Sequence, residues 1–253
     1  MLSCSGLTLA VPGRVLARDI GFEIRRGEIW AVLGANGSGK TTLVHALAGL
    51  APAPAGTVAL DGAPLAGQPG AARASLIGIL LQQEDAEFWG SVLDYVLLGR
   101  FPRARSWFGW QREDEDAAGA ALAAVGLADL ALRRYQTLSG GERQLARIAQ
   151  LLAQDPEALL LDEPLQHLDL RHQAAVLRLF SALAHERGRA VVMVLHDALW
   201  PARVCTHALL IHGGGTVEHG AMSDMLVRER LERLYGCRLQ EIGFGGQRFF
   251  APV

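Results

Sequence analysis

Four short runs of apolar residues recur along the chain, and each is followed by polar residues or by a glycine-rich loop. Each run is four or five residues long, and together they cover residues 29–33, 77–81, 158–161 and 191–195. Continuous apolarity over so few residues is typical of strands buried on both faces, as in a parallel sheet covered by helices. Because ligands of such sheets bind beyond the carboxyl ends of the strands, the groups that follow the runs are expected to converge on one crevice. The polar residues at these ends are Gln82, Asp162, Glu163 and His196.

Between these runs, apolar residues return at helical spacing. One helix is predicted directly after the first run, another from about residue 139 to residue 152, and a third from the acidic residues 113–116 through Ala124, closed by Gly126. Acidic residues suit the start of the third helix because the amino end of a helix is positive. The first of these helices is predicted from Leu43, Ala46, Leu47 and Leu50.

Composition narrows the class of protein. The chain has 253 residues and 50% hydrophobic content, enough for one substantial core or two small ones. Its 24 basic and 26 acidic residues nearly cancel, so no global field attracts nucleic acid or an anionic membrane. Three widely separated cysteines favour a reducing compartment over a disulfide or zinc framework. No apolar run approaches the roughly 18 residues of a spanning helix, so we expect a cytosolic protein that works at a membrane only through a partner.

The loop after the first run carries the most specific motif. Residues 34–41 are G-A-N-G-S-G-K-T, which fits the phosphate-loop pattern G-x-x-x-x-G-K-[ST]. Its glycines let backbone N–H groups turn towards phosphate oxygens, Lys40 can reach the β- and γ-phosphates, and the Thr41 hydroxyl can bind Mg²⁺. The helix that follows points its positive end at the same anion. A glycine-rich turn that matches by chance is the alternative, and the strand before the loop argues against it.

Asp162 and Glu163 are adjacent carboxylates at the end of the third apolar run. Such a pair is costly to bury unless a cation or hydrogen bonds compensate it. We therefore predict that Asp162 belongs to a Mg²⁺ site, directly or through water, and that Glu163 is the general base that polarises the attacking water. Taken alone, the pair is equally compatible with an acidic strand end followed by a turn at Pro164.

A second candidate anion site lies in residues 138–144, L-S-G-G-E-R-Q, which open the predicted helix to residue 152. Locally this is a capping box, in which Ser139 caps the helix and Glu142 reaches back to its backbone N–H. Two glycines in a first helical turn cost up to about 1 kcal/mol each relative to alanine, which capping alone does not justify. Exposed N–H groups at a helix start suggest that Gly140 and Gly141 serve an anion.

Together these residues resemble the ATP-binding-cassette (ABC) ATPases. The resemblance covers about residues 1–220 and consists, in order, of the phosphate loop, Gln82, L-S-G-G-E-R-Q, the L-L-L-D-E-P segment at 159–164, Leu168-Asp169 and His196. It implies an α/β fold with a P-loop NTPase (RecA-like) core and a mostly parallel sheet, an N-terminal antiparallel β subdomain and an inserted α-helical subdomain. The implied division of this single domain is 1–85 and 158–230 for the core, 86–157 for the helical subdomain and 231–253 for a tail.

The resemblance also implies a mechanism, in which two copies pair head to tail and hydrolyse MgATP at two composite sites. Gln82 would sense Mg²⁺, His196 would hold the γ-phosphate and the attacking water near Glu163, and Asp169 would tie the two sites together. The metal ligands would then be Thr41, Gln82 and Asp162. ATP would be held by Gly34, Ala35, Asn36, Gly37, Ser38, Gly39, Lys40, Thr41 and Thr42 of one copy and by Ser139, Gly140, Gly141, Glu142 and Asp169 of the other.

Three positions are uncertain within this resemblance. The family usually stacks an aromatic ring on adenine, but the nearest position here is about Val11, so base stacking is expected to be weak or supplied elsewhere. His167 stands where a small or hydroxylic residue is usual, and the sequence does not decide whether it only packs. Gln83 follows Gln82, and the family's spacing favours Gln82.

The segment after Gln82, up to G-R-F-P at 99–102, and L-H-D at 195–197 resemble ATPases of importers for large metal chelates, with cobalamin first and iron-siderophore or haem next. Such a subunit lies at the cytoplasmic face of the plasma membrane, bound to a dimeric polytopic permease that a periplasmic binding protein feeds. The alternative is a soluble ABC ATPase that acts on nucleic acid or ribosomes, but those proteins usually carry two cassettes or a long coiled coil.

Remaining features have simpler interpretations. The basic and aromatic loop at 100–112 is expected to pack on the helical subdomain or to meet the permease rather than bind nucleic acid. Histidines other than His196 lack a metal-binding framework and are expected to be solvated or in the core. The tail is expected to pack on the body through Phe244, Phe249 and Phe250.

Overall fold

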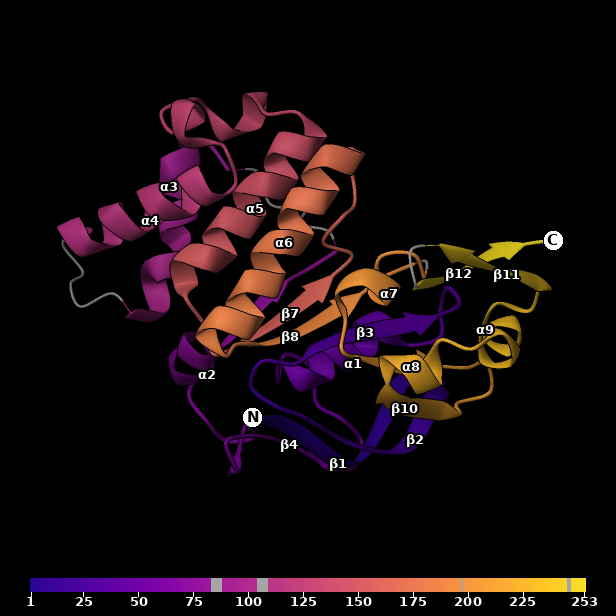
Figure 1. Ribbon diagram of the computed structural model, residues 1–253. Coiled ribbons are helices and arrows are strands. Elements are labelled where there is room, and N and C mark those ends of the chain that lie inside the picture. The colour runs from indigo at the N-terminus through magenta and orange to yellow at the C-terminus, as the bar shows by residue number, and fades with distance from the viewer. Residues whose placement is uncertain (83–87, 104–108, 197, 245–246) are drawn as a thin grey trace.

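A six-stranded sheet runs through the protein, with a layer of helices on one face and a four-stranded sheet on the other (Figure 1). The computed structural model describes residues 1–82, 88–103, 109–196, 198–244 and 247–253. Several residues singled out from the sequence lie outside this described part: Gln83, Arg105, Trp107, Phe108 and Asp197.

The central sheet has the strand order β10-β9-β3-β8-β7-β6. Five of its strands are parallel, and β10 pairs antiparallel with β9 at one edge. The four predicted runs form four adjacent strands, which places their carboxyl ends at one edge of the sheet. The strands are β3 (Ile29–Gly34), β6 (Ile77–Leu80), β7 (Ala158–Asp162), β8 (Ala190–Val194), β9 (His207–Ile211) and β10 (Val217–Ala221).

Both faces of this sheet are covered, as the continuous apolar runs predicted. In β3, Ile29 and Leu33 point into the core beneath the helices, whereas Trp30 and Val32 point into the core shared with the smaller sheet. This alternation follows from the period of two in a strand. Because neither face meets water, no polar residue interrupts the strand before the phosphate loop.

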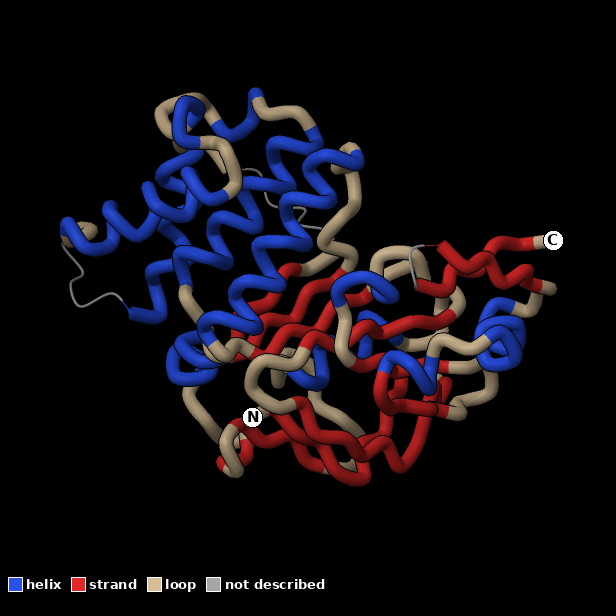
Figure 2. Tube along the Cα trace, in the orientation of Figure 1, coloured by secondary structure: helices blue, strands red, loops and turns tan. Residues whose placement is uncertain are grey.

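The smaller sheet is antiparallel, in the order β2-β1-β4-β5, and is formed mostly by the N-terminal residues. It packs on the same core as the helix after the phosphate loop. Figure 2 shows this division, with most strands in the lower part of the view and most helices in the upper part. The strands are β1 (Leu2–Val11), β2 (Arg14–Ile24), β4 (Thr57–Leu60) and β5 (Ala63–Pro64). Together the two sheets and the helical layer confirm the predicted α/β fold.

The helices follow the predicted spacing with one correction. Leu50 lies outside the helix after the phosphate loop and is 55% exposed, because Gly49 adopts a left-handed φ of 66° and the helix ends at Leu47. None of the described helices has the length and apolarity to cross a bilayer. The α-helices are α1 (Lys40–Leu47), α2 (Gly70–Leu76), α3 (Val92–Leu97), α4 (Arg112–Ala124), α5 (Gly140–Gln154), α6 (Leu170–Arg187), α7 (Pro201–Val204), α8 (Met222–Met225) and α9 (Arg228–Tyr235), and the 3₁₀ helices are η1 (Leu98–Arg103), η2 (Ala128–Leu130) and η3 (Tyr135–Thr137).

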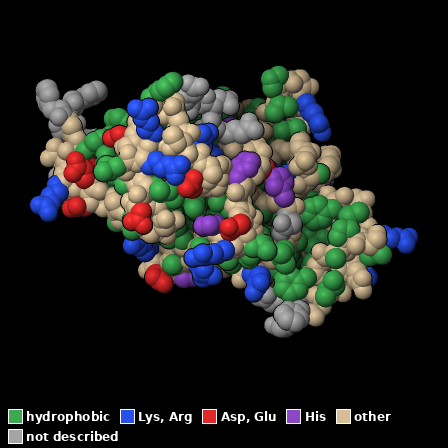
Figure 3. Space-filling model, turned by 90° about the horizontal axis from the view of Figure 1, so that it is seen from above, with side chains coloured by type: hydrophobic (Ala, Val, Ile, Leu, Met, Phe, Trp, Pro, Cys, Tyr) green, Lys and Arg blue, Asp and Glu red, His purple; other side chains and the backbone are tan. Residues whose placement is uncertain are grey.

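The C-terminal tail forms a hairpin of β11 (Leu239–Phe244) and β12 (Gln247–Pro252). Leu239 is buried and Phe250 packs on the large core, so the tail packs on the body. Of the three predicted phenylalanines, Phe249 is not among the residues packed on that core, and the side chain of Phe244 is outside the described part. Ile242 stays 46% exposed. Seen from above, apolar side chains gather towards the end of the molecule that carries this hairpin (Figure 3).

Candidate active site

The phosphate loop turns sharply between β3 and α1, and two glycines adopt left-handed conformations that favour glycine. Gly37 has a φ of 73° and Gly39 a φ of 109°. At Gly34 a β-carbon would lie only 2.6 Å from the Ser38 hydroxyl oxygen, so the loop closes tightly on itself. None of the described side chains caps the start of α1, which leaves its first N–H groups available to a ligand.

Lys40, the first residue of α1, is buried, with 6% of its surface exposed. Its ammonium donates to the carbonyl oxygens of Gly34 at 2.9 Å and Ala35 at 3.0 Å, which fixes the side chain along the loop. Burial lowers the pKa of Lys40, and the negative charges of Glu163 and Asp162 partly oppose that shift. The ammonium is thus held near the carboxylates, where a polyphosphate could use its positive charge.

Asp162 ends β7 and is completely buried. Burial raises the pKa of this carboxyl above its usual range, whereas the nearby Thr41 hydroxyl and His45 act in the opposite direction. Apart from the Thr41 hydroxyl, neither carboxylate oxygen has a hydrogen-bond partner among the described residues. A buried carboxylate with so few donors is costly, and a divalent cation would compensate it. The residues therefore fit Mg²⁺, which typically binds one or two carboxylates and completes its shell with water and substrate phosphates.

Glu163 follows Asp162 and is held by three side chains. Gln82 Nε2 donates to Glu163 Oε1 at 3.0 Å, Gln166 Nε2 donates to Oε2 at 2.9 Å, and His196 Nε2 lies 2.7 Å from the same Oε2. Glu163 is 8% exposed and adopts a left-handed φ of 54°. Strain of this kind costs about 1–3 kcal/mol in a residue other than glycine and concentrates at functional sites. The structure thus brings together the groups after three of the predicted strands.

A pocket of about 400 Å³ joins the phosphate loop to Gln82 and Glu163, a size suited to a small-molecule ligand. Its lining residues are Val11, Arg14, Leu16, Asn36, Gly37, Gly39, Lys40, Thr41, Thr42, Gln82 and Glu163.

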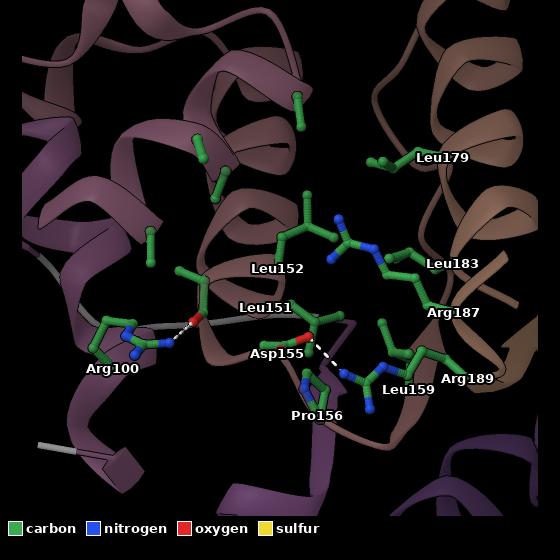
Figure 4. Close-up of a pocket in the computed structure, with 15 residues that line it drawn as sticks. Arg100, Leu151, Leu152, Asp155, Pro156, Leu159, Leu179, Leu183, Arg187 and Arg189 are labelled. Atoms are coloured by element: carbon green, nitrogen blue, oxygen red, sulfur yellow. Dashed lines mark hydrogen bonds and ion pairs between the residues drawn. The ribbon is translucent and has the colours of Figure 1, made fainter. Parts of the chain in front are cut away.

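A second hollow, of about 290 Å³, lies among α4, α5 and α6 (Figure 4). None of the predicted site residues lines it. Arg189 at its edge is paired with Asp155 at 2.9 Å, and Arg100 is paired with Asp114 at the same distance. We therefore assign the chemistry to the pocket of the phosphate loop.

Ser139 and Glu142 form the predicted capping box at the start of α5. Ser139 N donates to Glu142 Oε2 at 2.7 Å, and Glu142 N donates to Ser139 Oγ at 3.2 Å. The hydrogen bond from the Ser139 backbone holds the pKa of Glu142 below its usual range. None of the residues 139–142 lines the phosphate-loop pocket. One chain therefore presents two separate candidate anion sites.

Comparison with known proteins shows which family carries this pattern. The sequence profile of the ABC transporter family matches residues 17–166, more than half of the chain. The chain belongs to the ABC transporter family. It is therefore an ATPase whose hydrolysis of ATP is coupled to transport.

Relatives match this ABC ATPase along nearly its whole length. The ferric enterobactin transport ATP-binding protein FepC of Escherichia coli (strain K12) is 37% identical over 92% of this chain and 86% of FepC. The hemin import ATP-binding protein HmuV of Pseudomonas entomophila (strain L48) is 41% identical over 93% of this chain and 92% of HmuV. A solved inward-facing structure, described as being of the metal-chelate type of ABC transporter, superimposes with a TM-score of 0.86 at 30% identity, covering 100% of this chain and 97% of that one.

The outer end of the ATPase pocket departs from the usual family pattern. Val11, Arg14 and Leu16 line it, and none of the pocket-lining residues in the described part is aromatic. Val11 is 41% exposed. The prediction that base stacking is weak, or supplied from elsewhere, therefore stands.

His167 lies against the glycines of the second candidate anion site. It adopts a left-handed φ of 63°, and its carbonyl oxygen lies 3.1 Å from where a β-carbon on Gly141 would stand. Its side chain lies 3.7 Å from the corresponding position on Gly140. The exposed imidazole thus packs behind the L-S-G-G-E turn. The sequence alone did not decide whether His167 has this packing role.

Asp169 caps α6 by accepting a hydrogen bond from His172 N at 2.8 Å, and this hydrogen bond lowers the pKa of Asp169.

Sequence reasoning missed the residues that join the two candidate anion sites within the chain. Gln144, on α5, donates to the carbonyl oxygen of Pro164 at 3.0 Å. Arg147 donates to Gln144 Oε1 at 2.9 Å and also to the carbonyl oxygen of Leu81, directly before Gln82. Both side chains are buried, which is unusual for such polar groups. Their burial is what marks them as important, and it cannot be read from the sequence. The helix that begins at the capping box is thereby tied to the turns that carry Gln82 and Glu163.

Proposed function

We propose that this ATPase is the energy-coupling subunit of an importer for a metal chelate. The observation that carries the proposal is the convergence of Lys40, Gln82 and Glu163 on one pocket, while residues 139–142 of the same chain lie outside it. The names of the full-length relatives support uptake of ferric siderophore or haem. Cobalamin, which the sequence pattern placed first, has no support from these names and is kept as a third cargo to test.

We propose the following roles in one active site. Residues 34–42 bind the phosphates of ATP, and affinity rests mainly on these contacts. Thr41, Asp162 and Gln82 would hold Mg²⁺, which when bound would neutralise charge on the phosphoryl oxygens. Glu163 accepts the proton of the attacking water, and His196 orients that water and the γ-phosphate.

The second half of the site would come from another copy of the chain. Ser139, Gly140 and Gly141, with Glu142 behind them, would contact the γ-phosphate held by the partner subunit's Lys40, and Asp169 would link the two sites. This arrangement accounts for a helix start that is built for an anion but lies outside its own pocket. A homodimer would then close on two ATP molecules and open after hydrolysis.

The proposed division of the single domain follows the sequence interpretation. Residues 1–85 and 158–230 would form the nucleotide-binding core, residues 86–157 the helical subdomain, and residues 231–253 the tail. The helices α3, α4 and α5 contact one another pairwise, which supports grouping them. This grouping makes the helical subdomain the part that would move when Gln82 moves.

The proposed partner in the membrane is a dimeric polytopic permease, fed by a periplasmic binding protein, with this subunit bound peripherally at the cytoplasmic face. A groove of about 310 Å³ beside β6, lined by α2, η1 and α5, is a suitable docking surface. Leu50 lies in it and Phe101 is a neighbour of its lining residue Pro102, and both are more than half exposed. Exposed apolar side chains next to the strand of Gln82 would let a permease sense the site. Among the residues that the structure describes, no such feature supports a soluble role on nucleic acid.

The catalytic part of the proposal is tested by Glu163→Gln. This change keeps the shape of the side chain but removes the base, so turnover should fall by about 100-fold or more while ATP binding persists. The variant should accumulate as an ATP-bound dimer, measured by light scattering with chromatography. Lys40→Ala should instead weaken ATP binding itself. Undiminished hydrolysis by Glu163→Gln would contradict the assigned role.

The transport part is tested by copurification and uptake. The subunit should copurify with a polytopic permease, and vesicles that contain the complex should take up a ferric siderophore, haem or cobalamin in an ATP-dependent way. Leu50→Asp should weaken this association without changing the ATPase activity of the isolated subunit. Association with ribosomes and no permease would support the soluble alternative.

A further inference from the structure

We infer that Gln166 is a positioning residue that holds the carboxylate of Glu163 from behind, an inference that rests on the base role proposed for Glu163. Gln166 lies three residues after Glu163 and is half-buried. Its side-chain Nε2 donates to Glu163 Oε2 at 2.9 Å, and its backbone N donates to the Glu163 carbonyl oxygen at 3.2 Å. The amide and the carboxylate therefore belong to one turn and move together.

This turn is itself fixed from two helices. From α5, Gln144 donates to the carbonyl oxygen of Pro164 at 3.0 Å. From α6, Gln173 donates to the carbonyl oxygens of Leu165 at 3.4 Å and Leu168 at 3.0 Å. A residue carried on a turn with these restraints can orient its neighbour more precisely than a residue on a free loop.

Two of the three side chains, Gln166 and His196, contact Oε2 of Glu163, whereas Gln82 contacts Oε1. Gln82 and Glu163 both line the phosphate-loop pocket, whereas Gln166 does not. Gln166 instead lines a hollow of about 160 Å³ behind Glu163, together with His196 and Trp200. Glu163 lies between the two spaces, with Oε1 bonded to Gln82 and Oε2 bonded to Gln166.

The three donors also differ in what else they would bind. Under the proposed function, Gln82 would also bind Mg²⁺ and His196 would also bind the γ-phosphate, so both would share their contacts to Glu163 with a ligand. Gln166 has no such second ligand. A carboxylate offers about four lone-pair sites. Gln166 would therefore keep Oε2 in place while Oε1 is released towards the pocket, where it accepts the proton of the attacking water.

The experiment compares Gln166→Leu and Gln166→Glu by steady-state ATPase kinetics. Loss of the donor in Gln166→Leu should lower kcat about 10- to 100-fold and leave KM within about twofold, because misorientation affects the reacting group and not ATP binding. Gln166→Glu has the same shape but repels Glu163, so its kcat should be lower still. Gln68→Leu is the matched control, because it removes an exposed amide that donates only to Pro64.

The order of the two variants distinguishes positioning from packing. Equal losses in Gln166→Leu and Gln166→Glu, or a rise in KM as large as the fall in kcat, would overturn the inference. If Gln166→Leu unfolds, as judged from its melting temperature, Gln166→Glu still decides, and a kcat equal to wild type would overturn the inference.

The result is separable from the test of the base itself. Hydrolysis that persists in Glu163→Gln would remove the proposed function's catalytic assignment. An inactive Glu163→Gln together with normal kcat in both Gln166 variants would overturn only the role of Gln166. In the positive case, Glu163→Gln combined with Gln166→Leu should trap ATP in a dimer as Glu163→Gln alone does.

Discussion

The starts of α1 and α5 are two helix ends that suit an anion, and they are built in opposite ways. Within the described part of the chain, the start of α1 has no side-chain cap and lies beside a buried ammonium and a buried carboxylate with few donors. The start of α5 is satisfied within its own turn by the capping box of Ser139 and Glu142. The first end is incomplete without a ligand, whereas the second is stable alone.

This difference teaches which end carries the cost of the site. Buried charge and left-handed backbone around Lys40, Asp162 and Glu163 oppose folding unless something compensates them. The turn at Ser139 is exposed and capped by its own residues, so it is stable without a ligand. It could then bind a phosphate that another copy of the chain holds. We expect variants at the first end to change ligand binding and variants at the second to change assembly or stability.

Asp162→Asn should have the largest effect. Loss of the carboxylate should lower Mg²⁺-dependent ATPase activity by on the order of 100-fold or more. Without Mg²⁺ the same variant should melt at a higher temperature than the wild type, because a carboxylate whose charged form is disfavoured by burial has been removed. Calorimetry with EDTA and with Mg²⁺ measures this, and an Asn variant that melts lower in EDTA would contradict the comparison.

A pair of alanine substitutions should separate the two ends more finely. Gly39→Ala forces a side chain onto a φ of 109° and within 3.1 Å of Leu16, so ATP binding should weaken about 10- to 100-fold. Gly141→Ala places a β-carbon 3.1 Å from the His167 carbonyl oxygen and should leave ATP binding by the monomer unchanged. Its hydrolysis should fall because the two copies no longer approach closely. Titration with a fluorescent ATP analogue and an ATPase assay give the two readouts; weaker ATP binding in Gly141→Ala would be the contrary result.

Glu142→Gln should have the smallest effect, and its sign follows from the lowered pKa of Glu142. Because this pKa lies below the ordinary value of 4.5, its stabilising effect is complete above 4.5 and is lost as the pH falls through the folded-state value. The Gln variant should lose about 0.5 kcal/mol at pH 7, since solvent screens this partly exposed side chain, and less at pH 3. Urea unfolding at both pH values measures the difference; an equal loss at the two values would exclude a charge effect.

Ser139→Ala should lower the free energy of unfolding by about 1 kcal/mol at pH 7 through the lost cap.

Much of the fold and site followed from local sequence. The four apolar runs form adjacent strands because short, continuously apolar runs are typical of strands buried on both faces of a sheet. The groups after Leu81, Leu161 and Leu195 lie close together because the carboxyl ends of parallel strands lie at one edge. The capping box at Ser139 was predictable because it depends on residues three apart. The helix end at Leu47 was not, since one left-handed glycine outweighed the apolar spacing through Leu50.

What the sequence did not predict depends on contacts between distant segments. Strand β9 pairs with β3 although about 175 residues separate them, and its apolar run gave no sign of that neighbour. Gln166 lies between the L-L-L-D-E-P segment and Leu168-Asp169 and was passed over, because nothing in its spacing indicates that its amide turns back to Glu163. The role of Arg147 could not be predicted either, since its partner, the carbonyl oxygen of Leu81, is distant in the sequence and is identified only in the folded structure.

Arg147 and Gln144 join the carbonyls of Leu81 and Pro164 to the middle of α5, whose first turn would face the opposite nucleotide in a dimer. A shift of Gln82 or Glu163 in one active site would then be transmitted through α5 to the other active site. ATP hydrolysis at the two sites should therefore be cooperative, with a Hill coefficient for ATP above one. This coefficient should fall towards one when the side chain of either Arg147 or Gln144 is removed.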